Sequence, residues 1–194
     1  MTAPLLVLGS NSRYRAELLH RLGLTFEARA PGTEETLIAG EAPADRAMRL
    51  ALAKAADAGK GLRDALVIGS DQVAELDGML LEKPGTVGCA HAQLSACSAR
   101  TVQFHTALCV FDTRTDQRHT HLDLTQVHFR ALHAAEISRY IEREQPLDCA
   151  GSFKCEGLGI SLFDHIDNSD PTALIGLPLI ALARLLRDAG VAIP

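Results

Sequence analysis

The 194-residue sequence has no excess of positive charge and no long hydrophobic run. Lysine and arginine total 19 against 24 aspartate and glutamate, a formal net charge of −5, and the basic residues form no block. A duplex-DNA binder needs a positive stripe to displace counterions, so we expect no nucleic-acid partner. The longest nearly apolar run, 173–183, is about half the ~20 residues of a membrane span, so no membrane association is expected.

The cysteine pattern excludes a disulfide framework and a zinc ribbon. The five cysteines are odd in number and form no C-x-x-C pair. Buried thiols in a reducing cytosol explain them better. The N-terminal residues lack the basic and apolar segments typical of a signal peptide, so we expect a cytoplasmic protein.

The length predicts a single domain over 1–194, or two closely joined lobes. The order of apolar patterns predicts a mixed α/β sheet with flanking helices. Residues 5–8 and 65–69 are apolar runs without alternation, as in strands buried on both faces. Asp77-Gly78 predicts a type I′ hairpin turn between strands at 72–76 and 79–81. The other predicted elements are helices at 13–22, 43–58, 87–97, 134–144 and from Pro178, and strands at 25–28, 101–111, 119–129 and 160–163.

Polar residues follow both buried strands, at Ser10-Asn11-Ser12 and at Ser70-Asp71. Ligands of α/β sheets bind beyond the carboxyl ends of strands, so we expect both segments to face one cleft. The first segment opens a helix whose free N–H groups, with Arg13 and Arg15, suit a phosphate. An ordinary capped helix with exposed arginines would give the same pattern.

Asp71 is the candidate general base or metal ligand, because catalytic carboxylates commonly sit at such strand ends. A turn-capping role is the alternative. Taken singly, the other charged candidates are more commonly solvated surface charges; they are Glu34-Glu35 and the lysines at 54, 83 and 154. His119-x-His121 is more typical of a solvent-exposed strand face than of a metal site. The glycine-rich segment 151–159 contains no dinucleotide fingerprint, and a Walker loop is absent from the sequence.

Several motifs, in order and properly separated, resemble the Maf-like nucleotide pyrophosphatases over essentially the whole chain. They are LGSNS at 8–12 followed by Arg15, PGTEE at 31–35, AKA at 53–55, GSDQV at 69–73, EKP at 82–84, CAGSFKCEG at 149–157 and DPTALIGLP at 170–178. The resemblance implies a Maf/ITPase-like mixed twisted sheet with two lobes around a nucleotide-binding cleft. It also implies hydrolysis of a nucleoside triphosphate between the α and β phosphates, a divalent metal cation (Mg²⁺ or Mn²⁺) and, in many members, a homodimer.

The same resemblance assigns roles to particular residues. Asp71 falls on the family's proton-acceptor position and, with Glu35, is expected to hold the metal. The phosphates would be bound by Ser10, Arg15, Lys54, Lys83 and Lys154.

Three further positions are similar to those of the family branch that acts on 7-methyl-GTP. They are Tyr14, Gln72 and Glu156, which fall where the base is selected. N7-methylguanine is positively charged, so an aromatic ring attracts it by ~0.5–2 kcal/mol. A carboxylate such as Glu156 can accept from the guanine N1–H and the exocyclic amine together, which a pyrimidine cannot offer.

Two positions depart from the family pattern: Arg13 replaces the usual proline, and Ala16 a common second arginine. Either Arg13 supplies the missing charge from another angle, or the first loop has a different shape. Two other functions stay open: a Maf-like pyrophosphatase for dTTP, UTP or another modified nucleotide, and a non-catalytic nucleotide-binding regulator of cell division.

Overall fold

A computed structural model describes residues 4–194, which form two compact units. Unit 1 comprises the chain up to Gln72, Thr106–Asp123 and Asp170–Pro194, and unit 2 comprises Val73–His105 and Leu124–Ser169. The strands hydrogen-bond in the order β2 (Glu27–Ala28), β1 (Leu5–Leu8), β3 (Ala65–Leu76), β5 (Thr101–Asp112), β6 (Gln117–Phe129) and β7 (Phe163–Asp167), with β4 (Met79–Leu80) paired to β3. Parallel and antiparallel pairs both occur, so the predicted mixed sheet with flanking helices is confirmed.

Unit 1 begins with parallel strands and the helices that connect them. Leu5–Leu8 of β1 pairs in parallel with Ala65–Ile68 of β3, residue for residue. The elements are β1 (Leu5–Leu8), α1 (Arg13–His20), β2 (Glu27–Ala28), α2 (Pro43–Ala58), β3 (Ala65–Leu76), β5 (Thr101–Asp112), β6 (Gln117–Phe129), η3 (Ala173–Ile175) and α5 (Leu179–Asp188); β3, β5 and β6 also contribute residues to unit 2.

Local signals fix the ends of the first helices. The Ser12 hydroxyl caps α1 by accepting from the Arg15 N–H, and Gly23, at φ +68°, follows its end. Pro43 occupies the first turn of α2, where its missing N–H costs no hydrogen bond. The predicted starts and stops of both helices are therefore confirmed to within a few residues.

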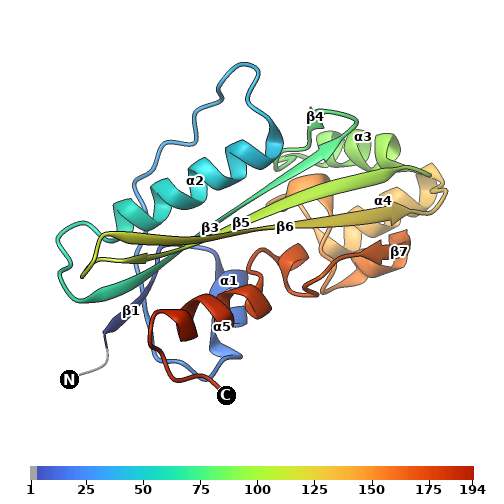
Figure 1. Ribbon diagram of the computed structural model, residues 1–194. Coiled ribbons are helices and arrows are strands. Elements are labelled where there is room, and N and C mark those ends of the chain that lie inside the picture. The colour runs from blue at the N-terminus through green and yellow to red at the C-terminus, as the bar shows by residue number, and fades with distance from the viewer. Residues whose placement is uncertain (1–3) are drawn as a thin grey trace. The chain divides into compact units, whose positions relative to one another are not determined.

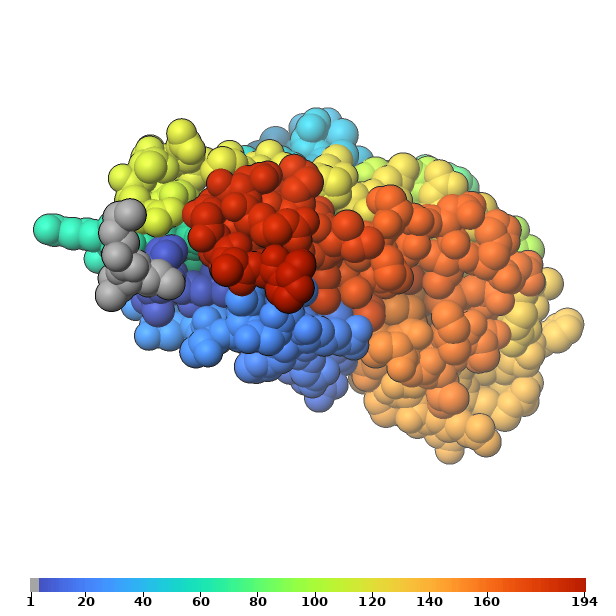
Figure 2. Space-filling model, turned by 60° about the horizontal axis from the view of Figure 1, so that its bottom comes forward, coloured from blue at the N-terminus to red at the C-terminus, as the bar shows by residue number. Residues whose placement is uncertain are grey.

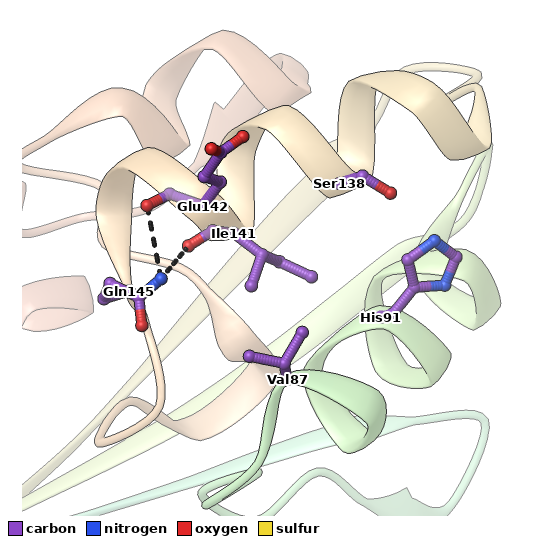
Figure 3. Close-up of a pocket in the computed structure, with 6 residues that line it drawn as sticks. All are labelled: Val87, His91, Ser138, Ile141, Glu142 and Gln145. Atoms are coloured by element: carbon purple, nitrogen blue, oxygen red, sulfur yellow. Dashed lines mark hydrogen bonds between the residues drawn. The ribbon is translucent and has the colours of Figure 1, made fainter.

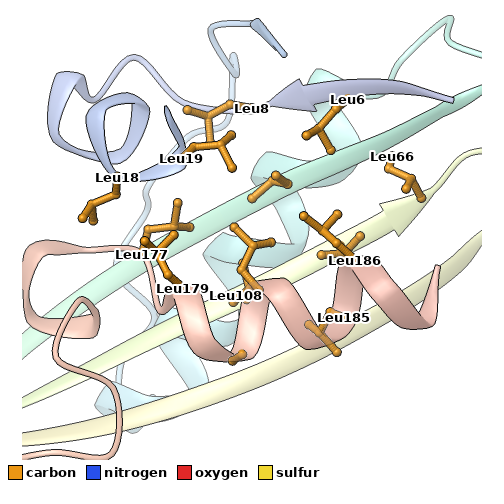
Figure 4. Close-up of a cluster of buried hydrophobic side chains, with 14 residues drawn as sticks. Leu6, Leu8, Leu18, Leu19, Leu66, Leu108, Leu177, Leu179, Leu185 and Leu186 are labelled. Atoms are coloured by element: carbon orange, nitrogen blue, oxygen red, sulfur yellow. The ribbon is translucent and has the colours of Figure 1, made fainter. Parts of the chain in front are cut away.

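Strand β3 is buried on both faces, and its alternation divides its side chains between two layers. Leu66 and Ile68 belong to a buried leucine-rich cluster with residues of β1, α1, β5 and α5 (Figure 4). Helix α2 lies on the other face, over Gly69 (Figure 1). Helices α1 and α5 lie next to each other on the cluster side (Figure 2). The two-residue period of a strand therefore sends Asp71 toward α2, and Ser70 and Gln72 toward the opposite layer.

Gly69 lets α2 pack directly on β3, and Gly69→Ala is expected to destabilise the protein by ~1–3 kcal/mol. A Cβ at Gly69 would lie 2.3 Å from the carbonyl oxygen of Ala51 and 2.6 Å from the amide nitrogen of Ala55, both backbone atoms of α2. Chemical denaturation measures the change. Gly88→Ala is the matched control, because a Cβ there meets nothing within 4 Å. Equal stability of the two variants would contradict close packing at Gly69.

Unit 2 has a separate aromatic core. Phe129, Phe153 and Phe163 contact one another edge to face, and Phe104 contacts Phe153 in the same way. Asp77 and Gly78 both adopt positive φ (49° and 82°), as the predicted hairpin between β3 and β4 requires. The elements specific to this unit are β4 (Met79–Leu80), α3 (Val87–Cys97), α4 (Ala134–Glu144), η1 (Ala150–Ser152), η2 (Leu158–Leu162) and β7 (Phe163–Asp167).

Three expectations from the sequence were wrong. The strands expected at 65–69 and 72–76 form one continuous strand, β3, because Ser70 and Asp71 between them pair their polar groups inside unit 1. The segment 160–163 is mostly a 3₁₀ helix, and the strand starts only at Phe163, which packs on the aromatic core. Not all thiols are buried, since Cys89 on α3 is exposed. Within residues 4–194, no helix combines the length and apolar character needed to span a membrane.

Candidate active site

The centre of the candidate site is a buried carboxylate held by a buried ammonium group. Asp71 is only 6% exposed, and Lys54 of α2 is 8% exposed. Lys54 Nζ donates to Asp71 Oδ1 at 2.6 Å. The same nitrogen lies 2.6 Å from Oε1 of Glu35, whose side chain is 55% exposed. Lys54 therefore joins two carboxylates from separate segments of unit 1.

Burial and charge act on Asp71 in opposite directions. Desolvation raises the pKa of Asp71 above its usual value, and Lys54 and Arg15 oppose this by attracting the ionised form. Burial also lowers the pKa of the Arg15 guanidinium, against the attraction of Asp71 and Glu35. On balance the pKa of Asp71 is raised, which makes Asp71 a stronger proton acceptor than an exposed aspartate.

The first loop and the segment 170–178 position the cationic side of this site. Arg15 Nε donates to the Gly176 carbonyl at 2.9 Å, and its Nη1 lies 3.4 Å from Ser10 Oγ. Ser70 Oγ donates to the same carbonyl at 3.0 Å. Arg15 and the Gly176 carbonyl therefore link Ser10 to Ser70 within unit 1, as expected for two segments that face one site.

The sequence analysis assigned no role to Asp170 and Thr172, which shape this segment. Asp170 is 3% exposed and accepts from the N–H and hydroxyl of Thr172 and from the Ile180 N–H at the start of α5. Thr172 Oγ1 also lies 2.9 Å from the Leu177 carbonyl oxygen. The Asp-Pro-Thr sequence at 170–172 was a turn signal that could have found them, because an aspartate side chain can accept from the backbone N–H two residues on. They hold the turn whose Gly176 carbonyl anchors Arg15 and Ser70.

Of the three base-selecting candidates, Gln72 and Tyr14 belong to unit 1. Gln72 Nε2 lies 2.9 Å from Thr106 Oγ1 and donates to the carbonyls of Ala173 and Leu174. The Tyr14 hydroxyl accepts from Arg13 Nη2 at 2.8 Å, and the Arg13 guanidinium carbon lies 4.8 Å from the centre of the Tyr14 ring. Arg13 thus interacts with Tyr14, and this ring already attracts a cation.

The remaining candidates, Lys83, Lys154 and Glu156, belong to unit 2. Lys83 is exposed, as is Glu156, whose Oε2 accepts from the Cys155 thiol at 3.5 Å. Lys154 Nζ donates to the Glu144 and Gln145 carbonyls at 3.1 and 3.4 Å, at the C-terminal end of α4. A cation there stabilises the negative end of the helix dipole, so Lys154 has a structural contact besides its expected phosphate role.

The Asp71–Glu35 pair suits a hard divalent cation. Both carboxylates contact the same Lys54 nitrogen at 2.6 Å. The distance between their two contacting oxygens is therefore no larger than the sum of these two distances. Carboxylate oxygens are the ligands that Mg²⁺ and Mn²⁺ prefer. The positive charges of Lys54 and Arg15 are balanced by these two carboxylates, so a triphosphate bound here would need further positive charge, which a divalent ion supplies.

A pocket of about 260 Å³ in unit 2 is not this site. It lies between α3 and α4 and is lined by Val87, His91, Ser138, Ile141, Glu142 and Gln145 (Figure 3). None of the candidate residues lines it, and its volume is below the ~300–1,000 Å³ of typical small-molecule sites.

Known proteins resemble the chain over nearly its full length. A protein from Xanthomonas oryzae pv. oryzae (strain MAFF 311018), named 7-methyl-GTP pyrophosphatase, is 58% identical over 98% of this chain and 100% of its own. One of the same name from Burkholderia thailandensis is 53% identical over 96% of this chain and 88% of its own. The Staphylococcus aureus Ham1 protein has a similar fold, with a TM-score of 0.52 at 14% identity over 94% of this chain and 98% of its own. The model of the Maf-like protein family matches residues 5–189, so the chain belongs to the Maf family.

Proposed function

We propose that the protein hydrolyses 7-methyl-GTP between the α and β phosphates, giving 7-methyl-GMP and diphosphate. The buried Asp71–Lys54 pair carries the proposal, because it combines a strong proton acceptor with a cation in the position of the family's catalytic motif. The names of the relatives that are 53–58% identical support this substrate.

In the proposed step, Asp71 accepts a proton as a water oxygen bonds to the α phosphorus. The bond from that phosphorus to the bridging oxygen breaks, and diphosphate leaves. Ser10, Arg15 and Lys54 bind the phosphates and stabilise their charge, since phosphoryl transfer depends mainly on positioning and electrostatics. Lys83 and Lys154 keep a phosphate-binding role as predictions from the family resemblance. Glu35 and Asp71 would hold Mg²⁺ or Mn²⁺, which neutralises phosphate charge.

The direct test is purified protein with Mg²⁺ or Mn²⁺ and a nucleotide panel that includes 7-methyl-GTP, GTP, dTTP and UTP. Release of diphosphate and a nucleoside monophosphate, with the highest kcat/KM for 7-methyl-GTP, is expected. Preference for dTTP or UTP would favour the pyrimidine alternative. Nucleotide binding without diphosphate release over hours would favour the regulator of cell division.

Selectivity for the methylated base should depend on Tyr14 and Glu156. Tyr14→Ala should reduce the preference for 7-methyl-GTP over GTP by about 2- to 30-fold, because it removes the ring that attracts the cationic base. Glu156→Gln should reduce the preference for 7-methyl-GTP over UTP, because the ionised acceptor for the guanine edge is lost. Tyr14→Phe is the control that keeps the ring. Unchanged relative kcat/KM values across the panel would refute both assignments.

A cytoplasmic setting and a homodimer belong to the proposal as well. All five cysteines are free thiols, which supports a reducing compartment. The oligomeric state follows from light scattering of the purified protein.

A further inference from the structure

Two histidines and an aspartate, none of which was given a role above, come together on strands β6 and β7 of unit 2. His128 of β6 lies directly opposite His165 of β7 in the antiparallel register, and Gln126 lies opposite Asp167. Opposite residues of an antiparallel pair share a face, and so do residues two apart on a strand. The two imidazoles and the Asp167 carboxylate therefore project from the same face of this strand pair.

The three side chains lie close together. His128 Nε2 lies 3.1 Å from Asp167 Oδ2, and His165 Nε2 lies 3.7 Å from the same oxygen. The two imidazole rings stack, with centres 3.9 Å apart and an angle of 12° between their planes. An imidazole binds a metal in the plane of its ring, so one of the two rings has to turn out of the stack when both bind the same ion. One ligand atom from each residue lies within 4.8 Å of the others, the one such group of three or more found in residues 4–194.

We propose that His128, His165 and Asp167 bind a divalent ion of the zinc class. Zinc takes imidazole nitrogen at ~2.0–2.1 Å and carboxylate oxygen at ~2.0–2.2 Å, so tetrahedral ligand atoms lie roughly 3.3 Å apart. The distances of 3.1 and 3.7 Å lie on either side of that separation. Two histidines and one carboxylate form a donor set that zinc uses in proteins, with a fourth position left to water.

A second contact orients one of the histidines. Thr101 Oγ1 of β5 lies 2.9 Å from His128 Nδ1, so it can accept the Nδ1–H and leave the Nε2 lone pair for a metal. The side chain of His128 is 25% exposed, and those of His165 and Asp167 are 58% and 66% exposed, so an ion can reach all three.

This site differs in chemistry from the Asp71–Glu35 pair. Imidazole nitrogen selects zinc, nickel and copper over Mg²⁺, whereas an all-oxygen pair favours Mg²⁺ or Mn²⁺. An ion here would stabilise the pairing of β7 with β6, and β7 is the last strand in the order of the sheet. It would thereby hold the end of the segment that carries Lys154 and Glu156 and continues into β7. The inference does not depend on the proposed hydrolysis.

Isothermal titration of the full chain with Zn²⁺, after chelator treatment, tests the site. The titration uses a Cys89→Ser background, because the exposed Cys89 thiol is another ligand that zinc can take. One equivalent is expected to bind and to raise Tm. His165→Ala should weaken the binding at least about 100-fold and abolish the Tm shift, and Thr101→Val should weaken it about tenfold.

The matched control is the double variant His119→Ala, His121→Ala. It removes two closely spaced histidines of β6 that are not part of the proposed site, and it should still bind one equivalent of zinc. Asp167→Asn provides a second test if His165→Ala fails to fold. Imidazole resonances of His128 and His165 should shift on zinc addition. Failure of the parent protein to take up one equivalent, or equal affinity in parent and His165→Ala, would overturn the proposal.

Discussion

Asp71→Asn is expected to lower kcat for nucleotide hydrolysis at least about 100-fold while leaving Tm close to that of the wild type. The amide cannot accept the proton that the carboxylate takes, and a positioned general base typically contributes 10²–10⁴-fold. Asparagine is nearly isosteric, and its amide oxygen can still accept from Lys54. Glu35 still pairs with Lys54, so the variant leaves no buried charge without a partner. Diphosphate release under saturating substrate and thermal unfolding measure the two effects.

The control for Asp71→Asn is Glu34→Gln, which removes an exposed carboxylate beside Glu35 without touching the Lys54 contacts. It should keep kcat within about threefold of wild type, because Glu34 has no part in the proposed proton transfer or metal binding. Wild-type turnover by Asp71→Asn would remove Asp71 from the mechanism. Equal losses in both variants would instead point to a general loss of negative charge.

Lys54→Met is expected to cost both activity and stability. Removing one partner of a buried ion pair leaves an uncompensated charge, at a cost of ~3–5 kcal/mol, and the side chains of Lys54 and Asp71 are each only 9% exposed. Turnover should fall as well, because Lys54 is proposed to bind phosphate. Denaturant titration and steady-state kinetics measure the two losses.

The double variant Lys54→Met, Asp71→Asn separates the charge effect from the loss of packing. Most of the stability lost in Lys54→Met should return in the double variant, because no buried carboxylate then lacks its cation. Additive losses in this cycle would contradict direct coupling between the two residues.

The pH dependence of Lys54→Met has a definite sign. Lys54 lowers the pKa of Asp71, so its removal raises that pKa further, and the acidic limb of kcat/KM should move to higher pH. An acid whose pKa is raised in the folded state stabilises that state at low pH, and this contribution is lost as the pH rises through the raised value. The stability deficit of Lys54→Met relative to wild type should therefore be larger at pH 7 than near pH 4. An acidic limb of kcat/KM at the same pH in Lys54→Met and wild type would contradict the Lys54–Asp71 contact.

Local sequence signals determined the elements that depend on neighbouring residues alone. Ser12 and Pro43 fixed the starts of α1 and α2, and Asp77-Gly78 fixed the hairpin, because capping and turn geometry are set within a few residues. The failures came where distant contacts act. The strand β3 runs on past Ser70 and Asp71 because β5, α2 and the 170–178 segment satisfy their polar groups.

The sequence by itself determined the Maf membership, since ordered motifs from residue 8 to residue 178 specify a family without any coordinates. The tertiary structure decided which charges meet: Lys54 joins Asp71 and Glu35, Lys154 caps α4, and Arg13 contacts Tyr14. It also brought together His128 and His165, which are 37 residues apart and were never singled out. Residue types indicate what a side chain can do, but partners far apart along the chain are set by strand register and helix packing, which local patterns do not encode.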